Sequence, residues 1–246
     1  MANEAISFQS PGRISSGSAD SILAGIWRQI LNDLKVDNAL LSDRINKYAE
    51  RVTKSCPDKL PQVRGNLRTD VGKTTMTWFT LTKNLRVLDM SFISIKMTCR
   101  HVHRNSEHLL GERLTDPDPE FLDLDEDKDN RTEPNTLSLF LQDVLRNLGV
   151  GVIMFEELLN RFLQRNKLDL NARNRTNVRG YLKKDFYAPR MTWKTIIKAM
   201  NFLCVTIIEF DITLTSRKGR VTKHRYVAQI SNIEDFAEEL KTGRGL

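Results

Sequence analysis

The sequence predicts an α+β fold made of two tandem homologous modules, and three observations support this class. A long motif occurs twice, each copy contains apolar residues at helical spacing, and each copy ends in residues that alternate like a strand. Each module is therefore expected to be mostly helical with a C-terminal β-hairpin. A winged-helix arrangement is one form of this element order, and another small α+β repeat is the alternative.

The repeat is clearest around a tryptophan in each copy. Residues 64–88 and 179–203 share ten of 25 aligned positions at a constant offset of 115, including Trp78 and Trp193. Similarity continues on both sides with small changes of offset, so we expect modules at residues 20–114 and 134–230. A flexible arm (1–19), an acidic linker (115–133) and a short terminal helix with a tail (231–246) complete the predicted organisation.

Each module opens with two stretches whose apolar residues recur every three or four positions. Helices are expected over about 22–34 and 39–52, and again over about 137–148 and 152–165. We expect long connections next, at 53–63 and 166–178. The Arg-Gly-x-Leu-x-x-Asp segment of each copy then predicts a short helix or turn.

The helix that contains the tryptophan has the best start signal in each module. Thr77 and Thr192 suit the N-cap, and the methionine before each of them suits a hydrophobic staple. Trp78 and Trp193 belong to the apolar stripe of their helices. We therefore expect them in the core rather than stacked on bases.

Strict alternation follows each tryptophan helix and predicts strands. It covers residues 93–97 in the first module and 210–214 in the second. Lys218-Gly219 predicts a turn into a further strand at 224–230. The corresponding turn of the first module, within 101–110, has no clear signal.

The charge balance favours an anionic partner. The chain has 38 Lys+Arg and 31 Asp+Glu; residues 20–110 carry a net +6, residues 134–230 a net +10 and residues 111–133 a net −7. Basic modules of this kind are typical of nucleic-acid-binding proteins, and a solvated surface is the ordinary alternative. The acidic linker could also cover a basic face as a phosphate mimic.

The candidate nucleic-acid contacts lie on the tryptophan helices and on the second hairpin. Residues 216–225 hold five Lys/Arg in ten positions, which suits contacts to phosphates. Duplex DNA is the favoured partner. The candidate residues are Thr80, Lys83, Arg86, Lys194, Thr195, Lys198, Arg217, Lys218, Arg220, Lys223 and Arg225.

The repeated Arg-Gly pair has two interpretations. Arg64-Gly65 and Arg179-Gly180 could bind a phosphate through the arginine and a close backbone approach. Alternatively, the glycine supplies an unusual backbone conformation and the arginine pairs with Asp70 or Asp185 of its own module. The second interpretation is the more common one for such a pair.

Other motifs are incomplete. Cys99, His101 and His103, with His108 nearby, have donor types that bind zinc, but the second module has no counterpart. Gly72-Lys73-Thr74 lacks the first glycine of a phosphate-binding loop, and the acidic run lacks the glycine and closing glutamate of a calcium loop. We therefore expect no metal, no cofactor and no catalytic site.

Three cysteines at unrelated spacings make a disulfide framework unlikely and favour a reducing, intracellular setting, and no apolar run predicts a membrane span. The segment 191–203, followed by Phe210 to Leu214 and a basic turn, resembles uncharacterised proteins encoded by tailed bacteriophages. This resemblance implies a location in the cytoplasm of an infected host cell, or in the virion. The leading hypothesis is a non-enzymatic nucleic-acid-binding protein; the alternative is a virion or assembly protein whose modules dock other phage subunits.

Overall fold

Four antiparallel strands form one sheet, in the order β2-β1-β3-β4. The computed structural model describes residues 19–100, 105–116, 136–149, 152–165, 171–186 and 191–230. The predictions of an arm, an acidic linker and a terminal helix fall on residues outside these ranges. Eight helices and the sheet confirm the α+β class for the described part of the chain, whereas a winged-helix arrangement is not confirmed.

The order of elements is the same in the two halves of the chain. The first half contains α1 (Ala19–Asp33), α2 (Asn38–Val52), a 3-10 turn (Pro57–Lys59), α3 (Leu60–Val71), α4 (Trp78–Val87), β1 (Met90–Arg100) and β2 (Asn105–Arg113). The second half contains α5 (Thr136–Asn147), α6 (Val152–Arg165), α7 (Ala172–Phe186), α8 (Trp193–Phe202), β3 (Ile207–Ser216) and β4 (Val221–Gln229). Both halves therefore end in a hairpin, including the first, whose turn had no clear signal.

The central ladder between β1 and β3 joins the two hairpins. Ile95 pairs with Ile212, and the flanking pairs are Ile93 with Leu214 and Met97 with Phe210. The sequence repeat aligns Ile95 with Ile212, so exchanging the two halves reproduces the same ladder. This register gives the sheet an approximate two-fold axis between these two isoleucines.

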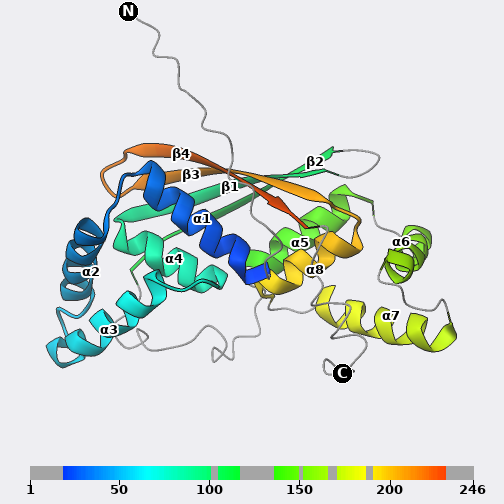
Figure 1. Cartoon of the computed structure of the whole chain (residues 1–246), viewed down its shortest axis with the longest axis horizontal. Helices are drawn as coiled ribbons and strands as arrows, with labels where there is room; N and C mark the ends of the chain where they lie inside the picture. The colour runs from blue at the N-terminus through cyan, green and yellow to red at the C-terminus, as the bar shows by residue number, and fades with distance from the viewer. Residues whose placement is uncertain are drawn as a thin grey trace, which may run out of the picture.

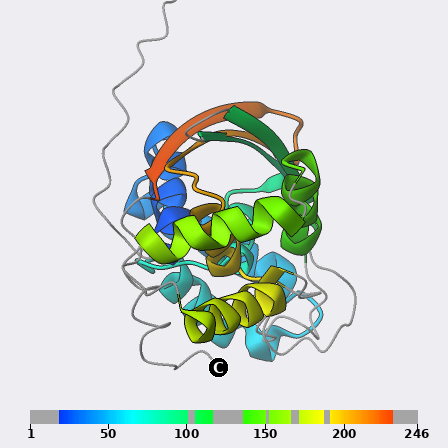
Figure 2. The ribbon, with the colours of Figure 1, turned by 90° about the vertical axis from the view of Figure 1, so that its right-hand side faces the viewer.

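The described helices cover one face of the sheet, and none of them lies on the other face, which we call the helix-free face (Figures 1 and 2). Helix α1 packs on β4, and α5 packs on β2, so each half covers the hairpin of the other half. Alternate residues of every strand, such as Ile95 and Phe210, are buried beneath the sheet in a single core. The two halves are thus interlocked through both the sheet and the helices.

The tryptophan helices begin and pack as the sequence predicts. The Thr77 and Thr192 hydroxyl oxygens accept hydrogen bonds from the backbone N–H of Thr80 and Thr195. Trp78 and Trp193 are 4% and 1% exposed, which confirms the core interpretation. Their rings stack with centroids 6.2 Å apart.

The predicted long connections are largely helical. A 3-10 turn and the start of α3 occupy residues 57–63, and α7 begins at residue 172. The Arg-Gly-x-Leu-x-x-Asp segments lie inside these two helices, which have twelve and fifteen residues. The sequence did not predict the full length of these helices, because their composition is polar and gives no clear apolar stripe. In α3, only Val63 and Leu67 are buried.

Backbone conformation also recurs between the halves. Asp89 and Cys204 follow the ends of α4 and α8 with φ of 64° and 61°, and both precede the first strand of their hairpin. Lys35 and Gly149 occupy the same kind of turn, with φ of 52° and 62°. Among the described helices, none is long and apolar enough to cross a bilayer.

Candidate nucleic-acid interface

Helix α4 lies inside the helical layer, which restricts the contacts that were predicted on it. It is packed against α1, α2, α3 and β1 (Figure 1). Thr80 was predicted to be exposed, but it is only 7% exposed, and its hydroxyl group lies 3.1 Å from that of Thr77. This part of the prediction is wrong because α4 is buried on more than the side marked by its apolar stripe.

Lys83 is used in an ion pair within the first half. Its Nζ lies 2.9 Å from Oδ2 of Asp70 on α3, and the two side chains are 16% and 13% exposed. Lys73 contacts the other oxygen of the same carboxylate at 2.6 Å. Partial burial raises the pKa of Asp70, but hydrogen bonds from Lys73 and Lys83 outweigh it and hold the pKa below its usual value. Lys83 therefore links α3 to α4.

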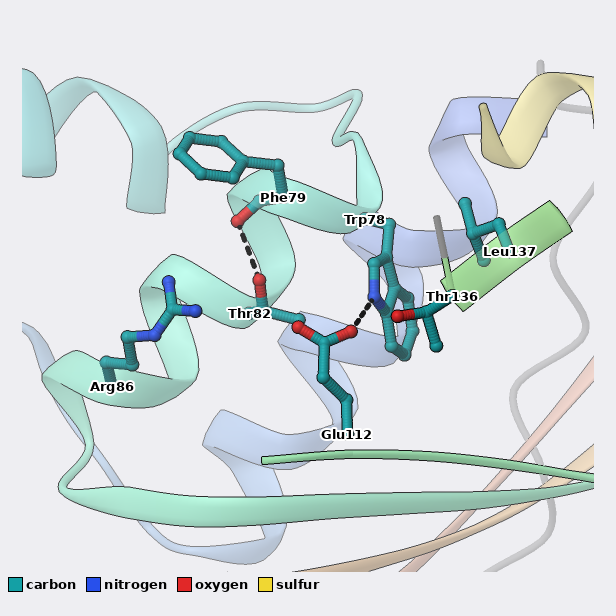
Figure 3. A pocket seen from close by; sticks show the side chains of 7 residues that line it. All are labelled: Trp78, Phe79, Thr82, Arg86, Glu112, Thr136 and Leu137. Carbon is teal, nitrogen blue, oxygen red and sulfur yellow. Dashed lines mark hydrogen bonds between the residues drawn. The ribbon is translucent and has the colours of Figure 1, made fainter. Parts of the chain in front are cut away.

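Arg86 lies at the edge of a small pocket between α4, β2 and the start of α5 (Figure 3). The Trp78 Nε1–H donates a 2.6 Å hydrogen bond to Oε2 of Glu112 in this pocket. The cavity volume is about 90 Å³, far below the roughly 300–1,000 Å³ of ordinary ligand pockets. The pocket lining consists of Trp78, Phe79, Thr82, Arg86, Glu112, Thr136 and Leu137.

Helix α8 is enclosed in the same way, by α1, α5, α6 and α7. Lys194, Thr195 and Lys198 are all half-buried. The Thr195 hydroxyl group lies 3.2 Å from that of Thr192, so Thr195 belongs to the start of the helix. A recognition helix needs an exposed face to enter a major groove, and every residue of α4 and α8 is buried or half-buried.

Arg217 lies at the end of β3 in a cluster of two arginines and two aspartates. Its Nη2 contacts Oδ1 of Asp116 at 2.5 Å, and its Nε lies 3.3 Å from Oδ1 of Asp89. Arg51 of α2 contacts the same two carboxylates, at 3.1 and 3.3 Å. The cluster therefore has no excess charge, and Arg217 anchors the second hairpin to the first half.

The remaining cations of the hairpin are exposed. Lys218 and Arg220 lie at the turn, and Lys223 lies on β4 opposite Thr213, on the helix-free face. None of the three forms an ion pair with any residue that the structure describes. Gly219 has φ of +78°, which places these charges on a tight turn.

Arg225 shares the helix-free face with Lys223 but has an acidic partner. Its Nη2 lies 2.5 Å from Oε2 of Glu209, and Arg100 contacts the other oxygen of that carboxylate. Burial raises the pKa of Glu209, but its hydrogen bonds with Arg225 and Arg100 hold the pKa below the usual value. Arg225 thus joins β4 to β3 and carries less free charge than Lys223.

The candidate residues therefore form two sets on different sides of the sheet. The hairpin set, on or beside the sheet, comprises Arg217, Lys218, Arg220, Lys223 and Arg225. The helix set lies beneath the sheet and comprises Thr80, Lys83, Arg86, Lys194, Thr195 and Lys198. No single surface brings all of them together, and only the hairpin set includes exposed cations without a described partner.

The potential zinc donors are only partly described. Cys99 and His108 both point to the helix side of the sheet and are 1% and 3% exposed. Burial raises the pKa of the Cys99 thiol to about 12, which disfavours the thiolate that zinc requires. His101 and His103 fall outside the described residues. Within the described ranges, no group of three or more such donors could hold a metal.

Sequence reasoning missed a matched pair of buried histidines. His224 Nδ1 on β4 lies 2.8 Å from Oδ2 of Asp33 on α1, and His108 Nδ1 on β2 lies 4.0 Å from Oδ2 of Asp143 on α5. Each histidine thus faces an aspartate from the other half of the chain. The offset of 116 between the two histidines, close to that of the repeat, was the available signal.

Comparison of the chain with models of known families, with curated proteins and with solved structures finds no match.

Proposed function

We propose that this protein binds nucleic acid without catalysing a reaction, and that duplex DNA is its favoured partner. The observation that carries the proposal is a group of exposed cations at one end of the sheet, Lys218, Arg220 and Lys223, which form no ion pair with the residues that the structure describes. Cations that have no acidic partner can release counterions from a phosphate backbone, which is the main source of affinity in such complexes. The basic balance of the chain, 38 Lys+Arg against 31 Asp+Glu, agrees with this role.

The proposal includes an origin from two fused, homologous modules. The sequence repeat, the recurring order of elements and the exchange symmetry of the β1–β3 ladder support it. The resemblance to proteins of tailed bacteriophages supports a place in phage DNA metabolism or transcription. The expected location is the cytoplasm of an infected cell, with the virion as the alternative.

Binding across a salt series tests the proposed function. The purified chain would be titrated with labelled duplex DNA, single-stranded DNA and RNA from about 50 to 200 mM salt. The triple variant Lys218→Gln, Arg220→Gln and Lys223→Gln should weaken binding and reduce the slope of log K against log salt by about 2 to 3.

A matched control removes the same amount of charge elsewhere. The triple variant Lys35→Gln, Lys47→Gln and Lys54→Gln changes three exposed residues on or beside α2. Its salt slope should stay close to that of the unmodified chain. Equal effects of the two triple variants, or no binding at about 50 mM salt, would contradict the proposal.

A second candidate function is docking of other phage subunits on the helix-free face of the sheet. The observation in its favour is that Phe92, Leu109 and Val221 on this side are 36%, 69% and 55% exposed. They lie on three different strands among charged residues, so this face is less apolar than a typical subunit interface. Light scattering over a concentration series tests it, and a monomer at all concentrations together with DNA binding would favour the first candidate.

A further inference from the structure

Two glycines occupy the middle of surface helices where the fold gives no reason for glycine. Gly65 lies in α3 and Gly180 in α7, and the sequence repeat aligns them. A Cβ added to either residue would have no atom within 4 Å other than those of its chain neighbours and its own helix backbone, and neither residue has the positive φ that favours glycine. In a helix interior glycine is less favourable than every other residue except proline.

The common interpretation of this Arg-Gly pair fails for its glycine in both halves and for its arginine in α3. Arg64 was expected to pair with Asp70, but its Nη2 lies 3.5 Å from Oε1 of Glu50 on α2. Arg179 contacts Glu156 on α6, with 2.6 Å between Nη2 and Oε1. Backbone conformation therefore does not explain the repeated glycine, and in α3 no ion pair between Arg64 and Asp70 explains the arginine.

The two arginines are held beside the glycines and remain partly accessible. Their side chains are 32% and 39% exposed. The Nε–H of each is buried without a hydrogen-bond partner among the described residues. A buried donor without an acceptor is costly, and the same one recurs at the same repeat position in both halves.

The surface around each glycine is polar. In α3, the exposed neighbours one helical turn away include Gln62, Arg68 and Thr69; in α7 they include Thr176 and Asn177. Neither helix has an exposed large apolar side chain among its described positions. The sequence of α7 has five Lys/Arg and one Asp, so a negatively charged partner suits it best.

Helices α3 and α7 lie on the side of the helical layer that faces away from the sheet (Figures 1 and 2). One belongs to each half of the chain, and their motifs are equivalent in the repeat. The molecule thus presents two similar polar helices, each with a glycine in the middle of its exposed side.

We infer that Gly65 and Gly180 mark two equivalent contact points at which the sugar-phosphate backbone of duplex DNA approaches the helix backbone. The absence of a side chain lets a phosphate come close to each helix, where Arg64 or Arg179 is already oriented by a glutamate. This inference rests on the proposed function. It adds a second contact surface to the hairpin set, on the opposite side of the molecule from the helix-free face.

The test uses the double variant Gly65→Gln and Gly180→Gln in the full chain. Glutamine is a good helix former, so the urea midpoint of unfolding should rise. Its side chain should nevertheless obstruct the approach of DNA and weaken binding by about tenfold or more, equivalent to about 1.4 kcal/mol. The double variant Gly65→Ala and Gly180→Ala adds only methyl groups, and it should show a smaller loss of binding with a similar rise in midpoint.

Ala39→Gln, on an exposed position of α2, is the control for the added side chain. It should leave binding unchanged. Unchanged binding of both glycine variants, while the hairpin triple variant binds more weakly, would overturn this inference and leave the proposed function intact. No binding by the unmodified chain would overturn both.

Discussion

Trp78 and Trp193 stack on each other with their ring planes inclined by 17°, although they are 115 positions apart in the sequence. Trp78 lies in the first turn of α4, and Trp193 lies in the first turn of α8, which is the equivalent helix of the second half. The contact therefore lies where the two halves meet beneath the shared sheet. Their surroundings differ, because Nε1 of Trp78 has Glu112 as its acceptor whereas Nε1 of Trp193 is buried with no partner among the described residues.

Replacing Glu112 should destabilise the fold. In Glu112→Ala, the indole N–H of Trp78 loses a charge-assisted hydrogen bond of 2.6 Å, and the free energy of unfolding should fall by about 1–3 kcal/mol. Urea unfolding at neutral pH measures this. Glu107→Ala on the same strand is the control, because Glu107 makes an exposed ion pair with Lys96, and it should cost less than about 1 kcal/mol. Equal losses in the two variants would show that the indole contact does not stabilise the fold.

The two His–Asp pairs should differ in strength. Asp33→Asn weakens a 2.8 Å contact with the buried ring of His224, so unfolding should become easier by about 1–2 kcal/mol. Asp143→Asn should have a much smaller effect, because the carboxylate lies 4.0 Å from His108 Nδ1, beyond hydrogen-bond distance. Thermal and urea unfolding of both variants test this order. A larger loss of stability in Asp143→Asn than in Asp33→Asn would contradict this prediction.

His108 should make the fold sensitive to mild acid. Burial lowers the pKa of His108 below its usual 6.5. The negative charge of Asp143, 4.0 Å away, raises the pKa but only partly offsets the effect of burial. The unfolded chain then binds a proton more readily than the folded chain as the pH falls below about 6.5. Stability should therefore be complete above that pH and decrease as the pH falls toward the lower pKa of the folded state.

Urea unfolding at about pH 7.5 and 5.5 measures this effect in the unmodified chain and in His108→Leu. The groups that face His108 are Asp143 and Phe140 from α5 and Ser106 on its own strand. The variant should lose less stability than the unmodified chain between the two pH values. The same loss in both proteins would assign the effect to other groups.

Two lysines should separate stability from binding. Lys83→Gln breaks a largely buried ion pair with Asp70, so it should reduce the free energy of unfolding by about 1–3 kcal/mol and leave DNA binding nearly unchanged. Lys218→Gln removes an exposed charge, so it should weaken binding with little change in stability. Urea unfolding and a DNA titration of both variants test the pair. If the Lys83→Gln variant is as stable as the unmodified chain but binds DNA more weakly, then α4 is part of the DNA-binding surface.

Much of the local structure follows from the sequence. Helix positions, the caps at Thr77 and Thr192 and the burial of Trp78 and Trp193 depend on spacing and on neighbouring residues, so a single sequence carries them. The joining of the two hairpins does not follow in this way. Alternation marks a strand, but it does not specify which strand lies beside it.

The errors in the candidate site have a similar cause. The apolar stripe of α4 shows the side that faces the sheet, but packing by α1, α2 and α3 buries Thr80 and brings Lys83 to Asp70. Both Lys83 and Asp70 recur in the repeat, and that recurrence was a signal of their pairing. The pairing of Arg217 with Asp116 depends on the interlocking of the halves, which no local pattern reveals.

The different surroundings of the two tryptophan N–H groups, of which only that of Trp78 has a described acceptor, have a directional consequence. In a symmetric dimer, the two subunits offer identical contacts to a bound duplex, so the two orientations of the duplex are equivalent. Here the peptide chain that connects the halves has allowed them to diverge, so one end of the molecule is chemically distinct from the other. A duplex that lies along both halves would therefore have one preferred polarity.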